Sequence, residues 1–256
     1  LFLPILNIDT LSIAILTLEE NPEFAKISET VSQYLPKTKL FNLQNTDSLT
    51  LTKLSSSIKN YNTIFVLGGN KGINEFTSAP KLNVLKSLID SKNCLLISIS
   101  PNRNLLPLKE ALSLKSIVLG YELNDYTPTV IAQNIFSGEP FKGKSPFDIT
   151  GICNSSQGIT TSKYKLGRGI PSEVDMDGSK LNSIDDIIQL GIEAKAMPGC
   201  QVLVARRGKI IFQKNYGYDN YDHANLVTDT TLYDIASVTK ITASLPMIMK
   251  LVDDNK

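Results

Sequence analysis

The sequence has few of the residues from which metal sites and disulfide frameworks are built. Its three cysteines, Cys94, Cys153 and Cys200, are widely separated and odd in number, so we expect neither a disulfide framework nor a metal site from them. Cys94 and Cys200 begin apolar strands, as core residues do. The single histidine, His223, lies in a polar stretch typical of a loop. With one histidine and no cysteine cluster, we predict no transition-metal site and no cofactor.

Long apolar runs and an excess of one charge are also missing. No apolar segment approaches the ~20 residues that a membrane-spanning helix needs. Lysine and arginine total 26, against 25 aspartate and glutamate residues. This balance gives no electrostatic reason to expect nucleic acid or an anionic membrane as a partner. The chain opens with "LFLPILN", without an initiator Met, a basic region or a cleavage motif, so we expect a piece of a longer protein whose targeting signal is lost.

The chain does contain a regular alternation of apolar strands and helices over residues 1–148. Strands are expected at 11–18, 38–43, 62–69, 94–100 and 116–122, and helices at 22–34, 48–61, 79–92, 104–114 and 125–138. The strands are continuously apolar, which is typical of a parallel sheet covered on both faces by helices. The sequence therefore predicts an α/β fold, a three-layer α/β/α sandwich with a mainly parallel sheet.

A glycine-rich stretch, "GGNKG", ends the third expected strand. Such a turn can cradle phosphate. However, Gly68, Gly69 and Gly72 do not fit the dinucleotide-binding fingerprint, and no Walker-type Gly-Lys-Ser/Thr follows. We therefore expect a tight turn at the carboxyl edge of the sheet, where a ligand contact stays open.

The pattern changes after residue 148. Residues 149–181 are rich in Gly, Ser, Thr and Pro and are expected to be a linker, partly anchored by Tyr164, Leu166 and Ile170. From residue 182 onward we expect an amphipathic helix capped by Ser183, an antiparallel hairpin around "RRGK", and a last helix that is apolar nearly all round and so buried. Two strands and two helices leave much apolar surface without a partner, so residues 182–256 are expected to be an incomplete α+β segment.

Ser237 and Lys240 stand three residues apart at the start of this last helix, where they share a face. A serine hydroxyl is a poor nucleophile unless a base lies within hydrogen-bond reach, and a lysine of lowered pKa can be that base. The spacing alone has little value, because Ser56 with Lys59, Ser78 with Lys81 and Ser162 with Lys165 repeat it. The residues alone leave two interpretations, a catalytic pair and a solvated first turn.

A resemblance favours the first interpretation. The stretch "PGCQVLVARRGKIIFQKNYGYDN", followed by "TDTTLYDIASVTKITAS", resembles the opening of the serine β-lactamase superfamily, in the branch of class C β-lactamases, penicillin-binding proteins and esterases. The resemblance implies that Ser237 is the acylated nucleophile and that Lys240 activates it. The family's Tyr-x-Asn element and its late Lys- or His-Thr-Gly motif do not follow Lys240. Only half of an active site is therefore expected here.

Residues 1–148 resemble the C-terminal α/β sandwich domain of glycoside hydrolase family 3. The resemblance rests on "AQNIFSG", Ala132 to Gly138, running into "PFKGKSP", in which Ser145 replaces the usual Leu, and on the opening "LFLPILNID". The order of the two halves is similar to that of fused bacterial proteins with a barrel of the β-N-acetylhexosaminidase kind. That barrel would carry the glycosidase residues, so none is assigned to this chain.

The sequence thus predicts an internal fragment of a fused bacterial hydrolase, inactive by itself. It predicts an amino-sugar oligosaccharide or other small-molecule substrate, a periplasmic or cell-envelope location, and missing N-terminal and C-terminal parts of the parent chain. Two alternatives stay open. One is a serine esterase or peptidase that uses the sandwich domain as a scaffold, and the other is a non-catalytic sugar-binding or interaction module.

Overall fold

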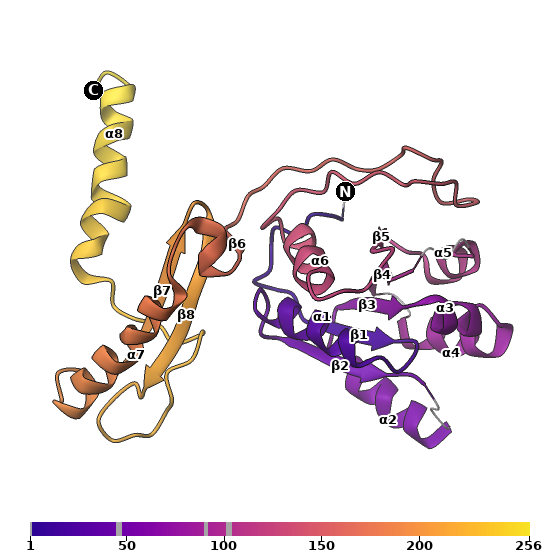
Figure 1. Ribbon diagram of the computed structural model, residues 1–256, viewed down its shortest axis with the longest axis horizontal. Helices are drawn as coiled ribbons and strands as arrows, with labels where there is room; N and C mark the ends of the chain where they lie inside the picture. Colours follow the sequence, from indigo (N-terminus) through magenta and orange to yellow (C-terminus); the bar gives the residue numbers. More distant parts are fainter. Residues whose placement is uncertain (1, 45–47, 90–91, 101–103) are drawn as a thin grey trace. The chain divides into compact units, whose positions relative to one another are not determined.

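The computed structural model describes residues 2–44, 48–89, 92–100 and 104–256, and the chain divides into two compact units (Figure 1). Unit 1 is Leu1–Arg168 and unit 2 is Gly169–Lys256. The stretch 149–181, expected to be a linker, is divided between them. Each unit is therefore described by itself.

Unit 1 contains the predicted parallel sheet. Its strands are β1 (Ile13–Thr17), β2 (Thr38–Asn42), β3 (Thr63–Gly68), β4 (Asn93–Ser98) and β5 (Ser116–Leu119). Every neighbouring pair is parallel, in the order β2-β1-β3-β4-β5. In the register, Ile13 lies beside Thr38 on one side and Thr63 on the other. The α/β fold class predicted from the continuous apolar strands is confirmed.

Helices cover both faces of this sheet (Figure 1). They are α1 (Pro22–Ser32), α2 (Ser48–Ile58), α3 (Asn70–Phe76), α4 (Ala79–Ile89), α5 (Leu106–Leu112) and α6 (Thr127–Ile135). Helices α1 and α6 pack with one core cluster, and α2 to α5 supply side chains to the other. Because successive strand residues point to opposite faces, Ile13 and Ile15 of β1 enter the first core, and Ala14 and Leu16 the second.

One helix of unit 1 was not expected. The stretch "GGNKG" was predicted as a tight turn, but β3 ends at Gly68 and α3 begins at Asn70, with Gly69 as its N-cap. The turn is thus the junction between a strand and a short helix. The prediction missed α3 because seven residues with two buried apolar side chains, Ile73 and Phe76, give too short a helical period to recognise.

The stretch after α6 is held to unit 1 by its backbone. Tyr164 and Leu166 are 65% and 45% exposed, so the expectation that they anchor this stretch is wrong. Instead the amides of Tyr164 and Lys165 donate to the carbonyl of Ser137, and the Ser137 hydroxyl donates to the carbonyl of Ser162. These hydrogen bonds satisfy backbone N–H and C=O groups, which in a stretch without regular structure would otherwise bond to water.

Unit 2 is built around a hairpin. Its elements are η1 (Pro171–Val174), α7 (Gly178–Glu193), β7 (Gly199–Arg206), β8 (Lys209–Gly217), η2 (Ala236–Val238), the π-helical segment η3 (Lys240–Ser244) and α8 (Leu245–Asp253). Strands β7 and β8 are neighbours in the second sheet. The antiparallel hairpin predicted around "RRGK" is confirmed. Arg207 and Gly208 form its turn, both with positive φ (49° and 76°), as a two-residue type I′ turn requires.

The first helix of unit 2 begins earlier than predicted. Ser183 was expected to be its N-cap, but α7 starts at Gly178, and the carboxylate of Asp177 accepts the amide of Ser179 at 2.9 Å. Asp177 fills the cap position, and the added turn buries Leu181 with Val174 and Ile211. Ser183 lies inside the helix, where its hydroxyl donates to the carbonyl of Lys180.

The last helix differs from the prediction in two ways. It was expected to run unbroken from Ser237, but it is divided into η2, η3 and α8. It was also expected to be buried, but α8 has no buried residue. Its apolar side chains are 47–68% exposed because nothing in unit 2 covers them. Among the described residues, no helix combines the length and the apolarity that crossing a bilayer requires.

Candidate active site

Ser237 and Lys240 contact each other directly. The Nζ atom of Lys240 donates a hydrogen bond to the Oγ atom of Ser237 at 2.8 Å. Ser237 lies in the middle of η2, and Lys240 is the first residue of η3, so the contact spans one turn. A proton can pass between hydroxyl and amine over this distance once the lysine is neutral.

The turn that carries Ser237 is fixed by local contacts. The carboxylate of Asp234 accepts the amide of Ala236 at 2.8 Å, and the carbonyl of Ile235 accepts the amide of Val238 at 2.8 Å. Ala236 has a φ of 41°, a left-handed conformation that residues other than glycine seldom adopt. Backbone conformations of this kind store free energy and cluster at functional sites. The strained residue immediately precedes the candidate nucleophile.

Pro246 accounts for the change from η3 to α8 in the last helix. It has no amide hydrogen, so no α-helical hydrogen bond can run from it to the carbonyl of Thr242. The wider π-helical segment η3 lies directly before it, and α8 resumes with proline in its first turn. The sequence signal was present, since a proline inside a helical pattern marks a break or kink.

Both members of the pair are exposed to solvent. A lysine becomes a base near neutral pH where burial or nearby positive charge lowers its pKa. The described residues of unit 2 do not bury Lys240. The geometry of a nucleophile and its base is present, whereas the described residues leave the pair exposed to water, which weakens such a pair.

Two of the other Ser-x-x-Lys repeats lack this contact. The Ser78 hydroxyl donates to the carbonyl of Glu75, and Lys81 forms an ion pair with the Glu75 carboxylate. The Nζ atom of Lys165 has no hydrogen-bond partner, so it does not reach Ser162. The pair at Ser237 is therefore distinguished from these two by geometry as well as by sequence context.

A polar cluster that the sequence did not reveal joins α7 to β8. Asp185 accepts hydrogen bonds from the hydroxyl of Tyr216 at 2.6 Å and from Nζ of Lys214 at 2.6 and 2.9 Å. The bond from Lys214, followed by that from Tyr216, lowers the pKa of the Asp185 carboxyl. Burial and the bond to Asp185 raise the pKa of the Tyr216 hydroxyl. The cluster orients α7 on the hairpin that precedes the candidate pair.

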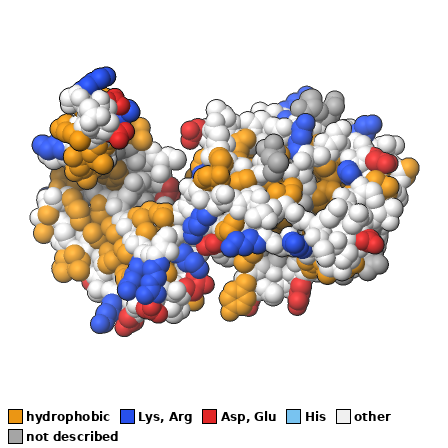
Figure 2. Space-filling model, turned by 90° about the horizontal axis from the view of Figure 1, so that it is seen from above, with side chains coloured by type: hydrophobic (Ala, Val, Ile, Leu, Met, Phe, Trp, Pro, Cys, Tyr) orange, Lys and Arg blue, Asp and Glu red, His pale blue; other side chains and the backbone are white. Residues whose placement is uncertain are grey.

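Unit 2 exposes much apolar surface, which is visible in the left part of Figure 2. Its large exposed apolar side chains include Ile187, Leu190, Leu203, Leu232, Tyr233, Ile235, Ile241, Met247, Ile248, Met249 and Val252. They come from α7, β7, the segment before η2, and both parts of the last helix. Exposed apolar side chains in this number are typical of surfaces that contact protein, membrane or ligand.

The glycine-rich junction of unit 1 already holds an anion of its own. The two oxygens of the Glu19 carboxylate accept the amides of Gly69 at 2.8 Å and Gly72 at 2.7 Å. These are the amides that a bound phosphate would need. A Cβ atom at position 69 would lie 2.2 Å from the carboxylate. The glycines therefore serve a close internal contact, and no phosphate site is assigned there.

Residues with metal-binding side chains do not gather in the described parts of the chain. No group of three His, Cys, Asp or Glu side chains is found there. Cys94 is buried in the sheet, and Cys153 and Cys200 are half-buried, all three as free thiols. His223 lies in the loop after β8, where its ring stacks on that of Tyr218 with 4.4 Å between centroids.

Comparison with known proteins supports part of this assignment. Residues 184–256 match the Beta-lactamase family model. A "Putative D-alanyl-D-alanine carboxypeptidase" of Salmonella agona is 38% identical over 93 residues, which are 34% of this chain and 21% of that protein. Protein flp of Staphylococcus aureus is 36% identical over 73 residues, or 28% of this chain and 14% of that protein. The chain thus spans about a fifth or less of the length of these relatives.

Among solved structures, a fungal multi-domain GH3 beta-N-acetylglucosaminidase with a GCN5-related glucosamine N-acetyltransferase region is similar to this chain. The TM-score is 0.49 and the identity 12%, over 61% of this chain and 18% of that one. A flavodoxin-like domain from Synechococcus has a TM-score of 0.35 and 12% identity, over 49% of this chain and 94% of that one. Similarity at this level assigns unit 1 to no family.

Proposed function

We propose that residues 182–256 are the first part of a serine hydrolase domain of the β-lactamase kind, with Ser237 as nucleophile and Lys240 as its base. The observation that carries the proposal is the 2.8 Å hydrogen bond between Lys240 and Ser237, within a segment that matches the family model. The strained φ of Ala236 next to Ser237 supports it.

The chemistry is acyl transfer. With Lys240 neutral, its Nζ takes the proton from the Ser237 hydroxyl while Oγ attacks the carbonyl carbon of a peptide, lactam or ester. The tetrahedral intermediate collapses to an acyl-enzyme, the C–N or C–O bond breaks, and the lysine returns its proton to the leaving group. Water then releases the acid by the same steps, and Ser237 is restored.

The relatives suggest a substrate class for the complete domain. The Salmonella relative is named for D-alanyl-D-alanine carboxypeptidase activity, so a peptide ending in D-alanyl-D-alanine is our first candidate substrate. The ester-cleaving alternative uses the same two residues. A panel of D-alanyl peptides and short acyl esters, given to a chain extended past Lys256, separates the two.

The 256-residue chain is proposed to be catalytically silent. Ser237 and Lys240 are exposed, and no described residue surrounds them with the donors that stabilise an oxyanion. The uncovered apolar side chains of α8 and the short coverage of the relatives support completion of the site by further protein. That protein would bury Lys240 and supply the missing donors.

The test is the intact mass of the protein after incubation with a fluorophosphonate or a penicillin. We expect no adduct on the 256-residue chain and one adduct per molecule on a chain extended past Lys256. Ser237→Ala should abolish this adduct, and the matched control Ser162→Ala should keep it. An adduct at Ser237 in the 256-residue chain would overturn the proposed silence, and its absence from the extended chain would overturn the nucleophile.

For unit 1 we propose the sandwich domain of a family 3 glycosidase, within a bacterial cell-envelope protein that acts on amino-sugar polymers. The support is the run from Ala132 to Pro146 and the five-stranded parallel sheet. A longer protein that carries the barrel should release nitrophenol from nitrophenyl N-acetyl-β-glucosaminide, and residues 1–148 should not. If the longer protein lost that glycosidase activity when unit 2 was removed, the two units would instead act as one catalytic assembly.

A further inference from the structure

Six lysines gather at the amino edge of the sheet of unit 1, opposite the edge that holds Glu19. They are Lys37, Lys39, Lys59, Lys86, Lys92 and Lys115. Lys37, Lys92 and Lys115 each stand immediately before a strand, namely β2, β4 and β5. Lys39 is the second residue of β2, and Lys59 and Lys86 lie at the ends of α2 and α4.

Parallel strands bring these residues together although the chain separates them widely. The amino ends of all five strands meet at one edge, and the order β2-β1-β3-β4-β5 spreads the lysines from one side of the sheet to the other. Four strand spacings of about 4.8 Å each make the row about 20 Å long. The whole chain has a net charge of +1, so the row is a local segregation of positive charge.

Within the described parts of the chain, these lysines have no carboxylate partner in an ion pair. Lys92 donates hydrogen bonds to the carbonyls of Tyr61 and Lys59, which hold its ammonium on the loop before β3. The other five are exposed, and a row of exposed lysines favours the approach of anions.

Two shallow, open cavities lie on this edge, and lysines line both. The first, about 340 Å³, is lined by Ser12, Pro36, Lys37, Thr38, Lys39, Asn60 and Tyr61. The second, about 310 Å³, is lined by Lys86, Ile89, Lys92, Asn93, Ala111, Leu112, Ser113 and Lys115. Among the described residues, no Asp or Glu lines either cavity. The row therefore passes over two shallow, open cavities against which an anionic chain can lie.

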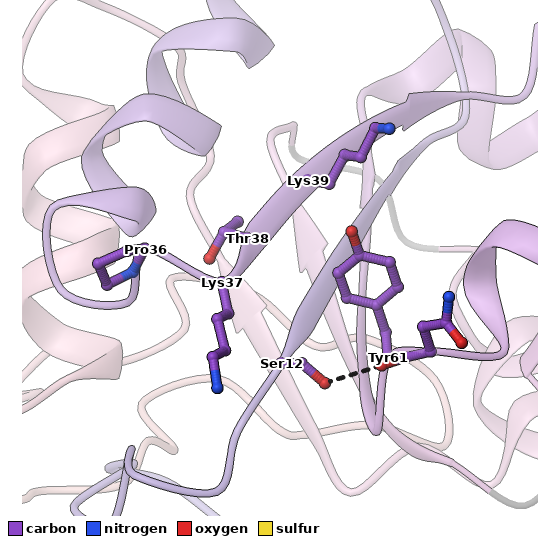
Figure 3. Close-up of a pocket in the computed structure, with 7 residues that line it drawn as sticks. Ser12, Pro36, Lys37, Thr38, Lys39 and Tyr61 are labelled. Atoms are coloured by element: carbon purple, nitrogen blue, oxygen red, sulfur yellow. Dashed lines mark hydrogen bonds between the residues drawn. The ribbon is translucent and has the colours of Figure 1, made fainter. Parts of the chain in front are cut away.

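The first cavity adds groups that suit a sugar. Figure 3 shows Ser12 and Tyr61 beside the start of β2, where Lys37 and Lys39 emerge. The Tyr61 ring packs edge-on against Phe41 at 5.9 Å, and Nζ of Lys39 lies 5.5 Å from the centre of the Phe41 ring. The packing holds the Tyr61 ring at the cavity, with its hydroxyl available for hydrogen bonding.

We propose that the amino edge of unit 1 binds a carboxylate-bearing polysaccharide along the row of lysines. The lysine ammonium groups pair with sugar carboxylates, and Tyr61 and Asn60 contact a sugar ring in the first cavity. In the described part of the chain no arginine lines either cavity, although the arginine fork is the side chain most suited to bidentate recognition of phosphate. The lysines are point charges that suit carboxylates spaced along a flexible chain.

The experiment is affinity electrophoresis of the full chain in gels that contain alginate, dextran, poly-L-glutamate or polyphosphate. We expect retardation to be strongest in alginate, weaker in the two polymers without sugar, and absent in neutral dextran. Added salt should weaken the retardation, because salt screens exposed charges. Equal retardation by alginate and polyphosphate, or none by alginate, would overturn the proposal.

Variants locate the surface. The doubles Lys37→Gln/Lys39→Gln and Lys86→Gln/Lys115→Gln should each weaken alginate binding about tenfold, since two exposed ion pairs are lost. The matched control Lys142→Gln/Lys144→Gln removes two exposed lysines elsewhere in unit 1 and should leave binding unchanged. Tyr61→Leu keeps an apolar contact with Phe41 and should remove the preference for alginate over poly-L-glutamate. If the control lost as much alginate binding as the two double variants, binding would depend on net charge alone. That result would overturn the proposed surface.

Discussion

The carboxylate of Glu19 accepts the backbone amide of Gly72 at 2.7 Å, across 53 residues of chain. Its other oxygen accepts the amide of Gly69 at 2.8 Å. The end of β1 is thereby bonded to the first turn of the short helix α3. A side chain of the protein occupies the position that an anionic ligand takes in other proteins with a glycine-rich turn.

Replacing Glu19 should therefore destabilise unit 1. Glu19→Ala leaves two amides without their charged acceptor, and we expect the free energy of unfolding to fall by about 1–3 kcal/mol. Urea denaturation followed by circular dichroism measures this. The control Glu20→Ala removes a neighbouring exposed carboxylate and should change stability by less than about 0.5 kcal/mol. If both changes lowered the free energy of unfolding equally, the contact of Glu19 with the two glycine amides would not be what stabilises unit 1.

Gly72 should not tolerate even one added carbon. A Cβ atom there would lie 2.9 Å from the backbone carbon and the Cβ atom of Leu18, and Leu18 is fully buried. Gly72→Ala should lower the free energy of unfolding by about 1–3 kcal/mol through overpacking. Gly143→Ala is the control, because nothing lies within 4 Å of a Cβ at that position. A neutral Gly72→Ala would show that β1 and α3 can move apart.

Replacing Ala236 with glycine should stabilise the turn that carries Ser237. Its φ of 41° strains a residue with a Cβ atom, and glycine adopts this region without that cost. We expect Ala236→Gly to slow amide hydrogen exchange at Val238, whose amide closes this turn. Ala243→Gly, in η3, is the opposite control and should speed exchange nearby, because glycine weakens helices. Faster exchange in Ala236→Gly would contradict the assignment of strain to this residue.

The contact of α7 with β8 should weaken in acid. The bonds from Lys214 and Tyr216 hold the pKa of the Asp185 carboxyl below its ordinary value. A carboxyl with a lowered folded pKa stabilises the fold above its unfolded pKa, and this contribution is lost as the pH falls through the folded value. Hydrogen-exchange protection of α7 should therefore decline below about pH 4.

The matched variant pair for this prediction is Asp185→Asn and Asp186→Asn. The first removes the charged acceptor, so protection of α7 should be weaker at neutral pH and should lose its acid dependence. The second changes the exposed neighbour and should keep the profile of the unaltered chain. An unchanged acid decline in Asp185→Asn would assign it to another carboxyl group.

Much of unit 1 could be predicted because its signals are local. Continuous apolar runs such as Ile13–Thr17 and Thr63–Gly68 specify strands buried on both faces, and such strands form parallel sheets. In unit 2 the pair Arg207 and Gly208, between two apolar strands, similarly specified the hairpin. Each of these predictions needed only residues within one element or its turn.

The candidate pair was also predicted from sequence. Ser237 and Lys240 are one helical turn apart, so any helical conformation brings their side chains together. Their hydrogen bond therefore follows from their close spacing in the sequence. The break at Pro246 was overlooked although its signal is local. The exposure of α8 was not predictable from its own residues, because burial depends on what other segments supply.

The sequence by itself determined the elements of this protein and the spacing of Ser237 and Lys240, because propensity, periodicity and turn chemistry act over a few residues. Only the tertiary structure decided that Glu19 meets Gly72, that Asp185 meets Tyr216, and that lysines from Lys37 to Lys115 share one edge. Those meetings depend on strand order and register. Both are set by packing free energy summed over the whole core, which no short stretch of sequence contains.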